Sequence, residues 1–253
     1  MPRASEARRL APALIVLACA AVALPAQAQS LADLVSSAQT ARVAPSGDAG
    51  LPGNQAIFGS REFQSRSLRG LPQWQRVLGK MKQIRQGFLR CAQDAAACRT
   101  DAQRSWREVV QQAAKLSREE QLKFVNGYFN RQPYRLDTEV YGVNEYWATP
   151  DEFLRMSGDC EDYAIAKFFA LRQLGFAADT LRIVILWDEI RSIGHAVLAV
   201  YEPQGILILD NLSELIVGHE RYRHYIPQYS MDESSRWAHV HSKKIPTLLA
   251  QRK

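Results

Sequence analysis

The sequence predicts an α+β fold in which helices come first and an antiparallel sheet follows. Up to about residue 132, apolar residues recur at the spacing of amphipathic helices. After Gly175, runs rich in β-branched and apolar residues alternate with turn signals. Helices followed by strands along one chain are typical of α+β architectures. The composition, 47% hydrophobic and 23% charged over 253 residues, excludes collagen-like, coiled-coil and wholly disordered classes.

The first 28 residues have the layout of a secretory signal peptide. A basic start (Arg3, Arg8, Arg9) precedes the apolar run 10–24, and the Ala-Gln-Ala at 26–28 matches a small-x-small cleavage site. The apolar run is short for a membrane span. A short membrane anchor is the alternative. We therefore expect export to the periplasm.

Removal of this signal leaves a weakly basic chain. The 225 remaining residues carry 29 basic groups (32 less 3) and 25 acidic groups (26 less 1), a net charge of +4. No basic stripe interleaved with aromatic residues is present, so a nucleic-acid partner is not expected. Residues 29–60 are rich in Ala, Ser, Gly and Pro and predict a flexible leader. The folded domain is then expected over 61–253.

Three helices are expected in the first half of the domain, at 72–91, 105–115 and 117–129. Ser117 followed by Glu120 fits a capping box at the start of the third. Cys91 and Cys98 bracket a short segment between the first two helices. In an oxidising compartment this pair is a candidate for a structural disulfide.

The second half changes from loop to helix and then to strands. Segment 132–150 predicts an ordered loop with four aromatic residues, and one helix is expected after Thr149-Pro150. A further helix should run from near Gly158-Asp159 to Gly175. Strands are expected at 181–187, 195–201 and 206–209, and the last two are joined by a tight turn at 202–205.

Cys160 stands at the start of the last predicted helix, with acidic residues on both sides. The partial positive charge at a helix N-terminus favours thiolate over thiol and so raises reactivity. Asp159, Glu161 and Asp162 act against this unless something neutralises them. A buried structural cysteine is the alternative, although three acids beside it do not suit an apolar core position.

The predicted hairpin at 195–209 places a histidine, His195, close to the carboxylate of Asp210. If Tyr201 faces Ile206 across the turn, opposed residues sum to 407, and His195 lies opposite Leu212. Asp210 then falls on the same sheet face as His195, one diagonal step away. A core histidine is the alternative. Together Cys160, His195 and Asp210 supply a nucleophile, its base and the group that orients the base. The backbone N–H of Cys160 is the expected oxyanion donor, with Trp147 a candidate neighbour.

Three blocks resemble the bacterial transglutaminase-like cysteine proteases, in particular those of the periplasmic LapG type. The blocks are Gly-Asp-Cys-Glu-Asp-Tyr-Ala at 158–164, Gly-His-Ala-Val-Leu at 194–198 and Leu-Asp-Asn at 209–211. The resemblance covers about residues 60 to 245. It implies a papain/transglutaminase-like fold, with Cys160 as nucleophile, His195 as base and Asp210 as the orienting acid.

The same resemblance implies calcium as a cofactor needed for activity. Asp159 and Glu161 match the family's calcium-binding positions, and Asp162 is a further candidate ligand. Carboxylate oxygens suit a hard cation, and a bound ion would cancel the local negative charge. Alternatively, these acids cap the helix and favour its dipole.

For function, the resemblance implies a calcium-dependent periplasmic cysteine endopeptidase that cuts the N-terminal region of a large surface adhesin. This cleavage would promote biofilm dispersal, and an inner-membrane cyclic di-GMP receptor would sequester the protease. Two alternatives stay open: another acyl-thioester enzyme (a transglutaminase, amidase or peptidoglycan peptidase), and a binding module that has lost catalysis.

The remaining histidines are weaker candidates for a site. His219 and His224 lie in a charged run that predicts an exposed segment. His239 and His241 alternate about Val240 and could share a strand face as metal ligands. Because no third ligand is near them in sequence, a solvated face is the preferred interpretation.

Overall fold

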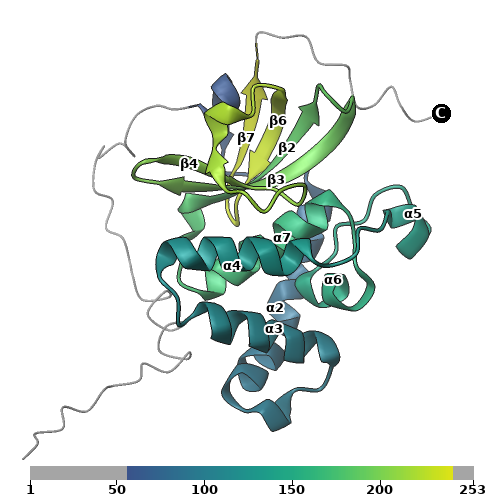
Figure 1. Cartoon of the computed structure of the whole chain (residues 1–253). Helices are drawn as coiled ribbons and strands as arrows, with labels where there is room; N and C mark the ends of the chain where they lie inside the picture. The colour runs from purple at the N-terminus through teal and green to yellow at the C-terminus, as the bar shows by residue number, and fades with distance from the viewer. Residues whose placement is uncertain (1–55, 242–253) are drawn as a thin grey trace, which may run out of the picture.

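The structure is a computed structural model that describes residues 56–241. Its strands form one antiparallel sheet in the order β1-β7-β6-β2-β3-β4-β5, and the helices lie together on one side of it (Figure 1). The predicted α+β class, with helices first and an antiparallel sheet after them, is therefore confirmed. The expected signal peptide at 1–28, and the leader up to residue 55, lie outside the described residues.

Five of the α-helices agree with the predicted ones apart from their ends, and the short α5 lies within segment 132–150, which was predicted to be a loop. The α-helices are α2 (Pro72–Gln93), α3 (Asp101–Ala113), α4 (Arg118–Asn130), α5 (Asp137–Val140), α6 (Pro150–Met156) and α7 (Cys160–Gln173). Helix α3 begins before the predicted 105 because Thr100 caps it and accepts the Gln103 N–H at 3.1 Å. The Ser117–Glu120 capping box of α4 is present. No helix of the described part is long and apolar enough to cross a membrane.

The strands include the three predicted ones. They are β1 (Arg61–Ser65), β2 (Leu181–Asp188), β3 (Ile193–Glu202), β4 (Gly205–Leu209), β5 (Val217–Gly218), β6 (Tyr225–Met231) and β7 (Arg236–Val240). In the β3–β4 hairpin Tyr201 pairs with Ile206 and Leu198 with Leu209. Both pairs sum to 407, so the register predicted from the tight turn is confirmed.

Both faces of the central strands are buried. Along β2, Ile183 contributes to the core between sheet and helices, whereas Val184 contributes to a second cluster on the opposite face. Strand β3 alternates in the same way, with Leu198 facing the helices and Val197 facing away. Helix α7 packs directly on β3 and β2, which places its first residue against the start of the hairpin.

Strands β1, β5, β6 and β7 were not predicted. Strand β6 contains Pro227, which cannot donate to a ladder and argues against a strand in sequence. The residue is accommodated because the pairing of β6 with β2 shifts between Ile185 and Leu186, a β-bulge next to the proline. Strand β1 is short and mostly exposed, so it lacks the apolar alternation that would reveal it.

The predicted leader, residues 29–60, extends too far, because residues 57–60 belong to the folded domain. Residues 57–60 are buried or form a tight turn, and Ile57 and Phe58 pack on the outer face of the sheet. The Phe58 N–H donates to His219 Nδ1 at 3.0 Å, and the Ser60 hydroxyl lies 2.9 Å from His239 Nδ1. Short sequences that pack only in tertiary context carry little local signal.

Two interpretations of histidines were wrong. His219 is buried rather than exposed, because it holds the segment at Phe58. His239 is also buried, with its two ring nitrogens bonded to Ser60 and Ser230 hydroxyls at 2.9 and 2.8 Å. Burial lowers the pKa of His239 to about 4, which suits a neutral ring between two hydroxyls. Neither a solvated face nor a metal pair describes it.

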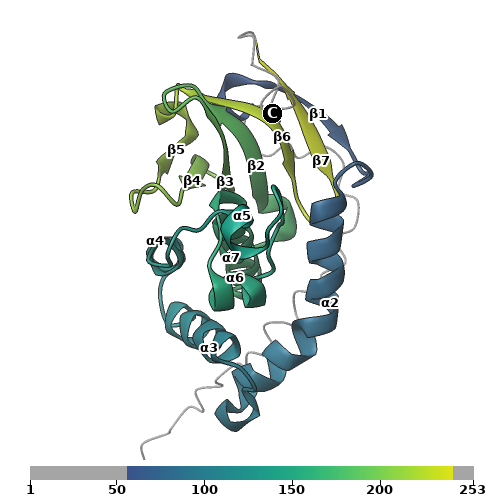
Figure 2. The same cartoon turned by 90° about the vertical axis from the view of Figure 1, so that its right-hand side faces the viewer.

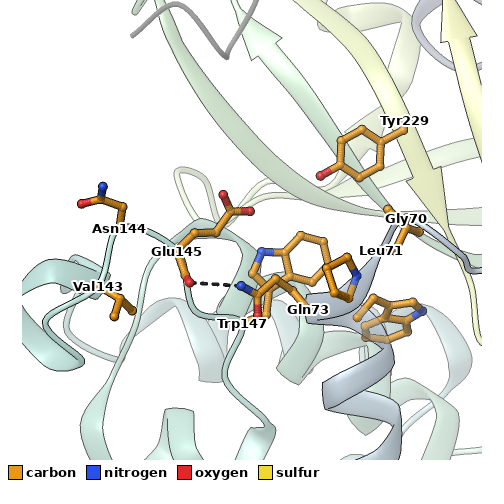
Figure 3. Close-up of a pocket in the computed structure, with 10 residues that line it drawn as sticks. Gly70, Leu71, Gln73, Val143, Asn144, Glu145, Trp147 and Tyr229 are labelled. Atoms are coloured by element: carbon orange, nitrogen blue, oxygen red, sulfur yellow. Dashed lines mark hydrogen bonds between the residues drawn. The ribbon is translucent and has the colours of Figure 1, made fainter. Parts of the chain in front are cut away.

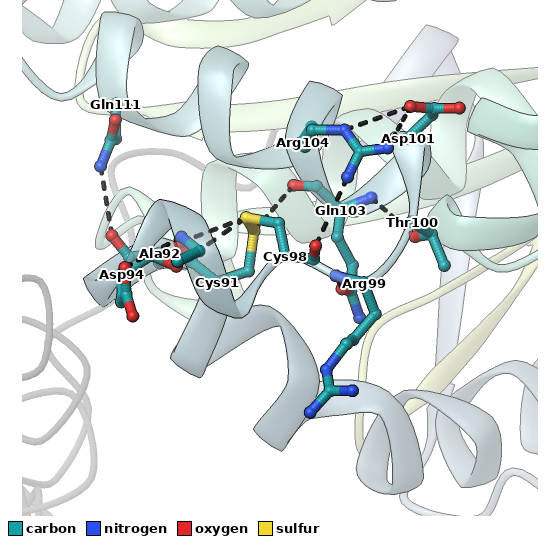
Figure 4. The surroundings of a disulfide bond; sticks show 11 residues. Cys91, Ala92, Asp94, Cys98, Arg99, Thr100, Asp101, Gln103, Arg104 and Gln111 are labelled. Atoms are coloured by element: carbon teal, nitrogen blue, oxygen red, sulfur yellow. Dashed lines mark hydrogen bonds and ion pairs between the residues drawn. A yellow bond between two sulfur atoms is a disulfide. The ribbon is translucent and has the colours of Figure 1, made fainter.

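Cys91 and Cys98, the candidate pair, form a disulfide (Figure 4). The bond ties the last turns of α2 to the short 3-10 turn Ala95–Ala97. Gln103, from the first turns of α3, accepts the Arg99 N–H with its side chain at 2.7 Å. Helix α2 runs along one side of the molecule, from the sheet to this corner (Figure 2), so the disulfide lies at the end of the helical layer away from the sheet.

Candidate active site

Cys160 is the first residue of α7 and is half-buried. Amides at the first positions of a helix have no partner within the helix, so the Cys160 N–H is free to bind an oxyanion. The backbone N–H of Ala196 on β3 is close enough to the sulfur to lower the thiol pKa. Cys160 therefore lies against the first half of β3, where His195 directly precedes Ala196.

His195 and Asp210 form a buried pair, and His195 directly precedes Ala196, whose N–H reaches the Cys160 sulfur. His195 Nε2 lies 2.9 Å from Asp210 Oδ1, and both side chains are 1% exposed. The confirmed hairpin register explains the contact, since it puts the two residues on one sheet face. Because Nε2 is engaged with Asp210, Nδ1 is the ring nitrogen left for the thiol.

Asp210 is held by groups that sequence analysis missed. The Tyr225 hydroxyl donates to Asp210 Oδ2 at 2.6 Å, and the Leu212 N–H donates to Oδ1 at 3.0 Å. Burial raises the pKa of Asp210. The hydrogen bond to His195, the His195 charge and these two donors lower it by more, so the pKa of Asp210 lies below its usual range. Tyr225 lies on β6, an unpredicted strand, and only the fold brings it here.

The acids around Cys160 are crowded and poorly neutralised. The thiol donates to Glu161 Oε2 at 3.2 Å. Burial raises the pKa of the thiol well above its usual range, and the nearby Glu161 and Asp159 carboxylates raise it further. Burial, and then the neighbouring acids, also raise the carboxyl pKa values of Asp159, Glu161 and Asp162. In this arrangement the nucleophile is held protonated.

Gly158 is required by the position of Asp162. Asp162 Oδ1 accepts the Ala148 N–H at 2.6 Å, and Oδ2 accepts the Asp159 N–H at 3.3 Å. A Cβ on residue 158 would lie 2.0 Å from Asp162 Oδ2. The helix-capping alternative is therefore real for Asp162, and the glycine of the Gly-Asp-Cys block makes room for it.

A cavity of about 400 Å³ opens beside the acids. It lies between the start of α2, the loop before α6 and β6, and Figure 3 shows Glu145, Trp147 and Tyr229 around it. The Gln73 side chain closes one wall by donating to the Glu145 carbonyl at 3.2 Å. Burial raises the pKa of Tyr229, and the charges of Glu145 and Glu161 raise it further, so this wall of the cavity is within electrostatic reach of the acid beside Cys160. Trp147, the candidate neighbour of the oxyanion, is buried and lines this cavity.

Comparison with known proteins identifies the family. Residues 80–245 match the model for the bacterial transglutaminase-like cysteine proteinases, a range that holds Cys160, His195 and Asp210. The chain belongs to this family. No curated protein matches the chain.

Three solved structures of LapG from Legionella pneumophila are similar to this chain. One is 30% identical and covers 60% of this chain and 87% of LapG, with a TM-score of 0.52. The calcium-bound form is 29% identical over 64% of this chain and 90% of LapG. The EGTA-treated form is 28% identical over 64% and 94%. Both forms also have a TM-score of 0.52. The predicted relationship to LapG-type proteases is thus confirmed.

One further acid, Asp137, lies beside two of the predicted ligands. Carboxylate oxygens of Asp137, Asp159 and Asp162 lie within 4.8 Å of one another. Asp137 Oδ1 and Asp159 Oδ1 are buried without a hydrogen-bond partner, and burial, followed by the Asp159 and Glu145 charges, raises the pKa of Asp137 to about 7. Unpartnered carboxylate oxygens facing one another fit a cation. Asp137 lies in α5, 22 positions before Asp159, so no local sequence motif indicates that it belongs near the other acids.

Proposed function

We propose that this chain is a calcium-dependent cysteine endopeptidase that acts in the periplasm on the N-terminal region of a large surface adhesin. The observation that carries the catalytic part is the buried His195–Asp210 pair, together with the next residue of β3, Ala196, whose N–H reaches the Cys160 sulfur at the N-terminus of α7. A thiol, an imidazole and a carboxylate in this order form the working parts of a cysteine protease.

The steps follow from the positions of these groups. His195 takes the thiol proton, and the Cys160 sulfur attacks the scissile carbonyl carbon while the carbonyl oxygen accepts the Cys160 N–H. The imidazolium, stabilised by Asp210, gives its proton to the departing amine as the C–N bond breaks. Water then loses a proton to His195 and attacks the thioester, and the carboxylic product leaves as the sulfur regains its proton.

Calcium is assigned to the acids beside the nucleophile. Asp159, Glu161 and Asp162 are the predicted ligands, and the orphaned Asp137 Oδ1 is a further candidate. Their oxygens form two groups that share Asp159: one with Asp137 and Asp162, and one with Cys160 and Glu161. A bound divalent cation would supply the positive charge that this cluster lacks. Glu161 would then no longer accept the Cys160 proton, so the thiol could pass it to His195. The calcium-bound and EGTA-treated forms of LapG support this assignment.

Substrate, place and regulation rest on the likeness to LapG-type proteases. The proposed substrate is the N-terminal region of a surface adhesin, whose release would disperse a biofilm. An inner-membrane receptor for cyclic di-GMP would bind and sequester the protease. The secretory signal layout of residues 1–28 supports the periplasm as the compartment.

The test is cleavage of an adhesin N-terminal fragment by the purified protein with calcium present. We expect cleavage by the wild-type protein, none by Cys160→Ala, and reversible loss in excess EGTA. Peptidoglycan fragments and an amine donor, offered in parallel, would detect the other acyl-thioester activities. Cleavage by Cys160→Ala at the wild-type rate would refute the assignment of the nucleophile, and full activity in EGTA would refute the metal role.

A further inference from the structure

Helix α4 reaches the catalytic acid from outside the elements that carry the triad. Its last residue, Asn130, donates from Nδ2 to the Asp210 carbonyl at 2.9 Å and to the Ser213 carbonyl at 3.0 Å. One amide group therefore bridges the two ends of the turn that follows β4. Helix α4 also packs on α7, so the turn is tied to the helix that bears Cys160.

The chemistry of this contact requires an amide. An Asn nitrogen has two N–H donors, which match two carbonyl oxygens. The opposite orientation of the amide would put its oxygen against both carbonyls, so the hydrogen bonds themselves fix which atom is nitrogen. An aspartate would place acceptors against acceptors, and an apolar residue would leave both carbonyls without this donor.

The held turn decides where the Asp210 carboxylate lies. Asp210 Oδ1 accepts the Leu212 N–H from within the same turn and bonds His195 Nε2 on its other side. A shift of the turn would therefore change the His195–Asp210 contact directly. Small misplacements of catalytic groups cost far more in rate than in stability.

We propose that Asn130 is a positioning residue of the triad, which holds the Asp210 turn so that its carboxylate meets His195. The inference rests on the proposed triad but not on the proposed substrate. A matched residue exists on the same helix: Asn126, one turn earlier, donates to the Ser213 and Glu214 carbonyls at 2.9 and 3.4 Å. It binds the same loop without touching Asp210.

The experiment compares Asn130→Leu with Asn126→Leu in the full chain, labelled with ¹⁵N-histidine. The readout is the NMR resonance of the His195 Nε2–H proton, assigned by its loss in His195→Gln. We expect Asn130→Leu to move this resonance in the direction seen in Asp210→Ala, and Asn126→Leu to leave it in place. In an Asp210→Ala background, Asn130→Leu should cause no further change.

Kinetics on the adhesin fragment add a second readout. Asn130→Leu should lower kcat about tenfold with KM unchanged, because Asn130 does not touch substrate. A variant that loses thermal stability but keeps the wild-type His195 resonance would overturn the proposal, since it would show a structural role only. If Asn130→Leu does not fold, Asn130→Ser replaces it in the same comparison. A moved resonance without adhesin cleavage would retain the positioning role and reject the substrate.

Discussion

At the scale of single residues, buried polar groups around Asp210 determine the chemistry of the site. Tyr225, Leu212 and His195 surround its carboxylate, and Lys167 lies near it from α7 without a hydrogen-bond partner for its amine. None of these contacts except the one with His195 follows from a sequence motif. Each can be tested by removing one polar atom.

Tyr225→Phe removes the hydroxyl that donates to Asp210 Oδ2. A hydrogen bond to a charged group contributes about 1.5–3 kcal/mol, so turnover should fall, though less than in Asp210→Ala. The native pKa of Asp210 lies below its unfolded value of 3.8, so its stabilisation is present above that value and is lost as pH falls through the native pKa. In Tyr225→Phe the native pKa rises toward 3.8, so the stabilisation from Asp210 is smaller at pH 7 and its loss is complete at a higher pH. Urea unfolding between pH 3 and 7 measures it, and superimposable curves for variant and wild type would contradict the expectation.

Lys167→Met should stabilise the protein at neutral pH. Burial lowers the pKa of Lys167 from 10.5 to about 7, and the Asp210 charge only partly offsets this. The unfolded chain therefore binds a proton that the folded chain does not between about pH 7 and 10.5, and wild-type stability rises across that window. At about 1.4 kcal/mol per pKa unit, the cost at pH 7 is a few kcal/mol. An apolar residue of similar length removes it.

Urea unfolding of wild type and Lys167→Met at several pH values measures the difference. The advantage of the variant should be greatest at pH 7 and below and should shrink toward pH 10. Groups that titrate alike in both proteins cancel in this comparison. A difference that does not change with pH would show that the Lys167 amine is paired in solution.

At the scale of elements, the α2–α3 corner is held by a bond that the chemistry of the site does not use. The disulfide between Cys91 and Cys98 closes a short loop at the end of the helical layer. Helix α2 also anchors α6, because Arg76 and Lys80 both bond Glu152, at 3.0 and 2.9 Å. The corner is therefore connected to the site through contacts between helices, which include these ion pairs and the bond from Trp106 Nε1 to Gln173 Oε1, rather than through the disulfide itself.

The double variant Cys91→Ala, Cys98→Ala should lower stability and leave kcat unchanged. For a loop with a sequence separation of 7, chain entropy gives a contribution of about 2–3 kcal/mol. Urea unfolding of the variant against the wild type measures the loss. Reduction of the wild-type protein by dithiothreitol should reproduce it. A fall in kcat equal to that of a triad variant would contradict the separation of corner and site.

At the scale of the whole molecule, the acidic cluster joins α5 to α7 and should link calcium to global stability. A ligand that binds only the folded state raises the unfolding free energy by about 2.7 kcal/mol at a hundredfold excess over Kd. Calcium should therefore raise the Tm of the wild-type protein. Asp137→Asn should weaken this rise, and Asp179→Asn, an exposed acid of the turn Ala178–Thr180, should not.

The rise in Tm should also depend on pH. The Asp137 carboxyl has a pKa of about 7, so protons compete with the cation below that value. Thermal unfolding with and without calcium should show a larger difference at pH 8 than at pH 6. An equal rise in wild type and Asp137→Asn would remove Asp137 from the ligand set.

Features that depend on neighbouring residues could be predicted from the sequence, whereas contacts between elements remote in sequence could not. The helices other than α5, the β3–β4 register and the His195–Asp210 contact could be predicted, because each depends on periodicity or on one tight turn. Asp137, Asn130 and Tyr225 could not, since each reaches the site from an element remote in sequence. His219 and His239 were misjudged for the same reason: their partners belong to the segment 57–60, whose packing has no local signal.

Because β1 pairs with β7, the first strand of the described chain can join the sheet only after the last strand is present. Arg61 pairs with Val240, so the two ends of the described chain lie side by side in one sheet. The residues of the site, from Asp137 to Tyr225, are all available before residue 236 emerges during synthesis or export. Strand β7, which joins β1 to the sheet, is not yet available at that point. A chain cut short before β7 would thus retain every catalytic residue yet leave its first strand with no neighbour.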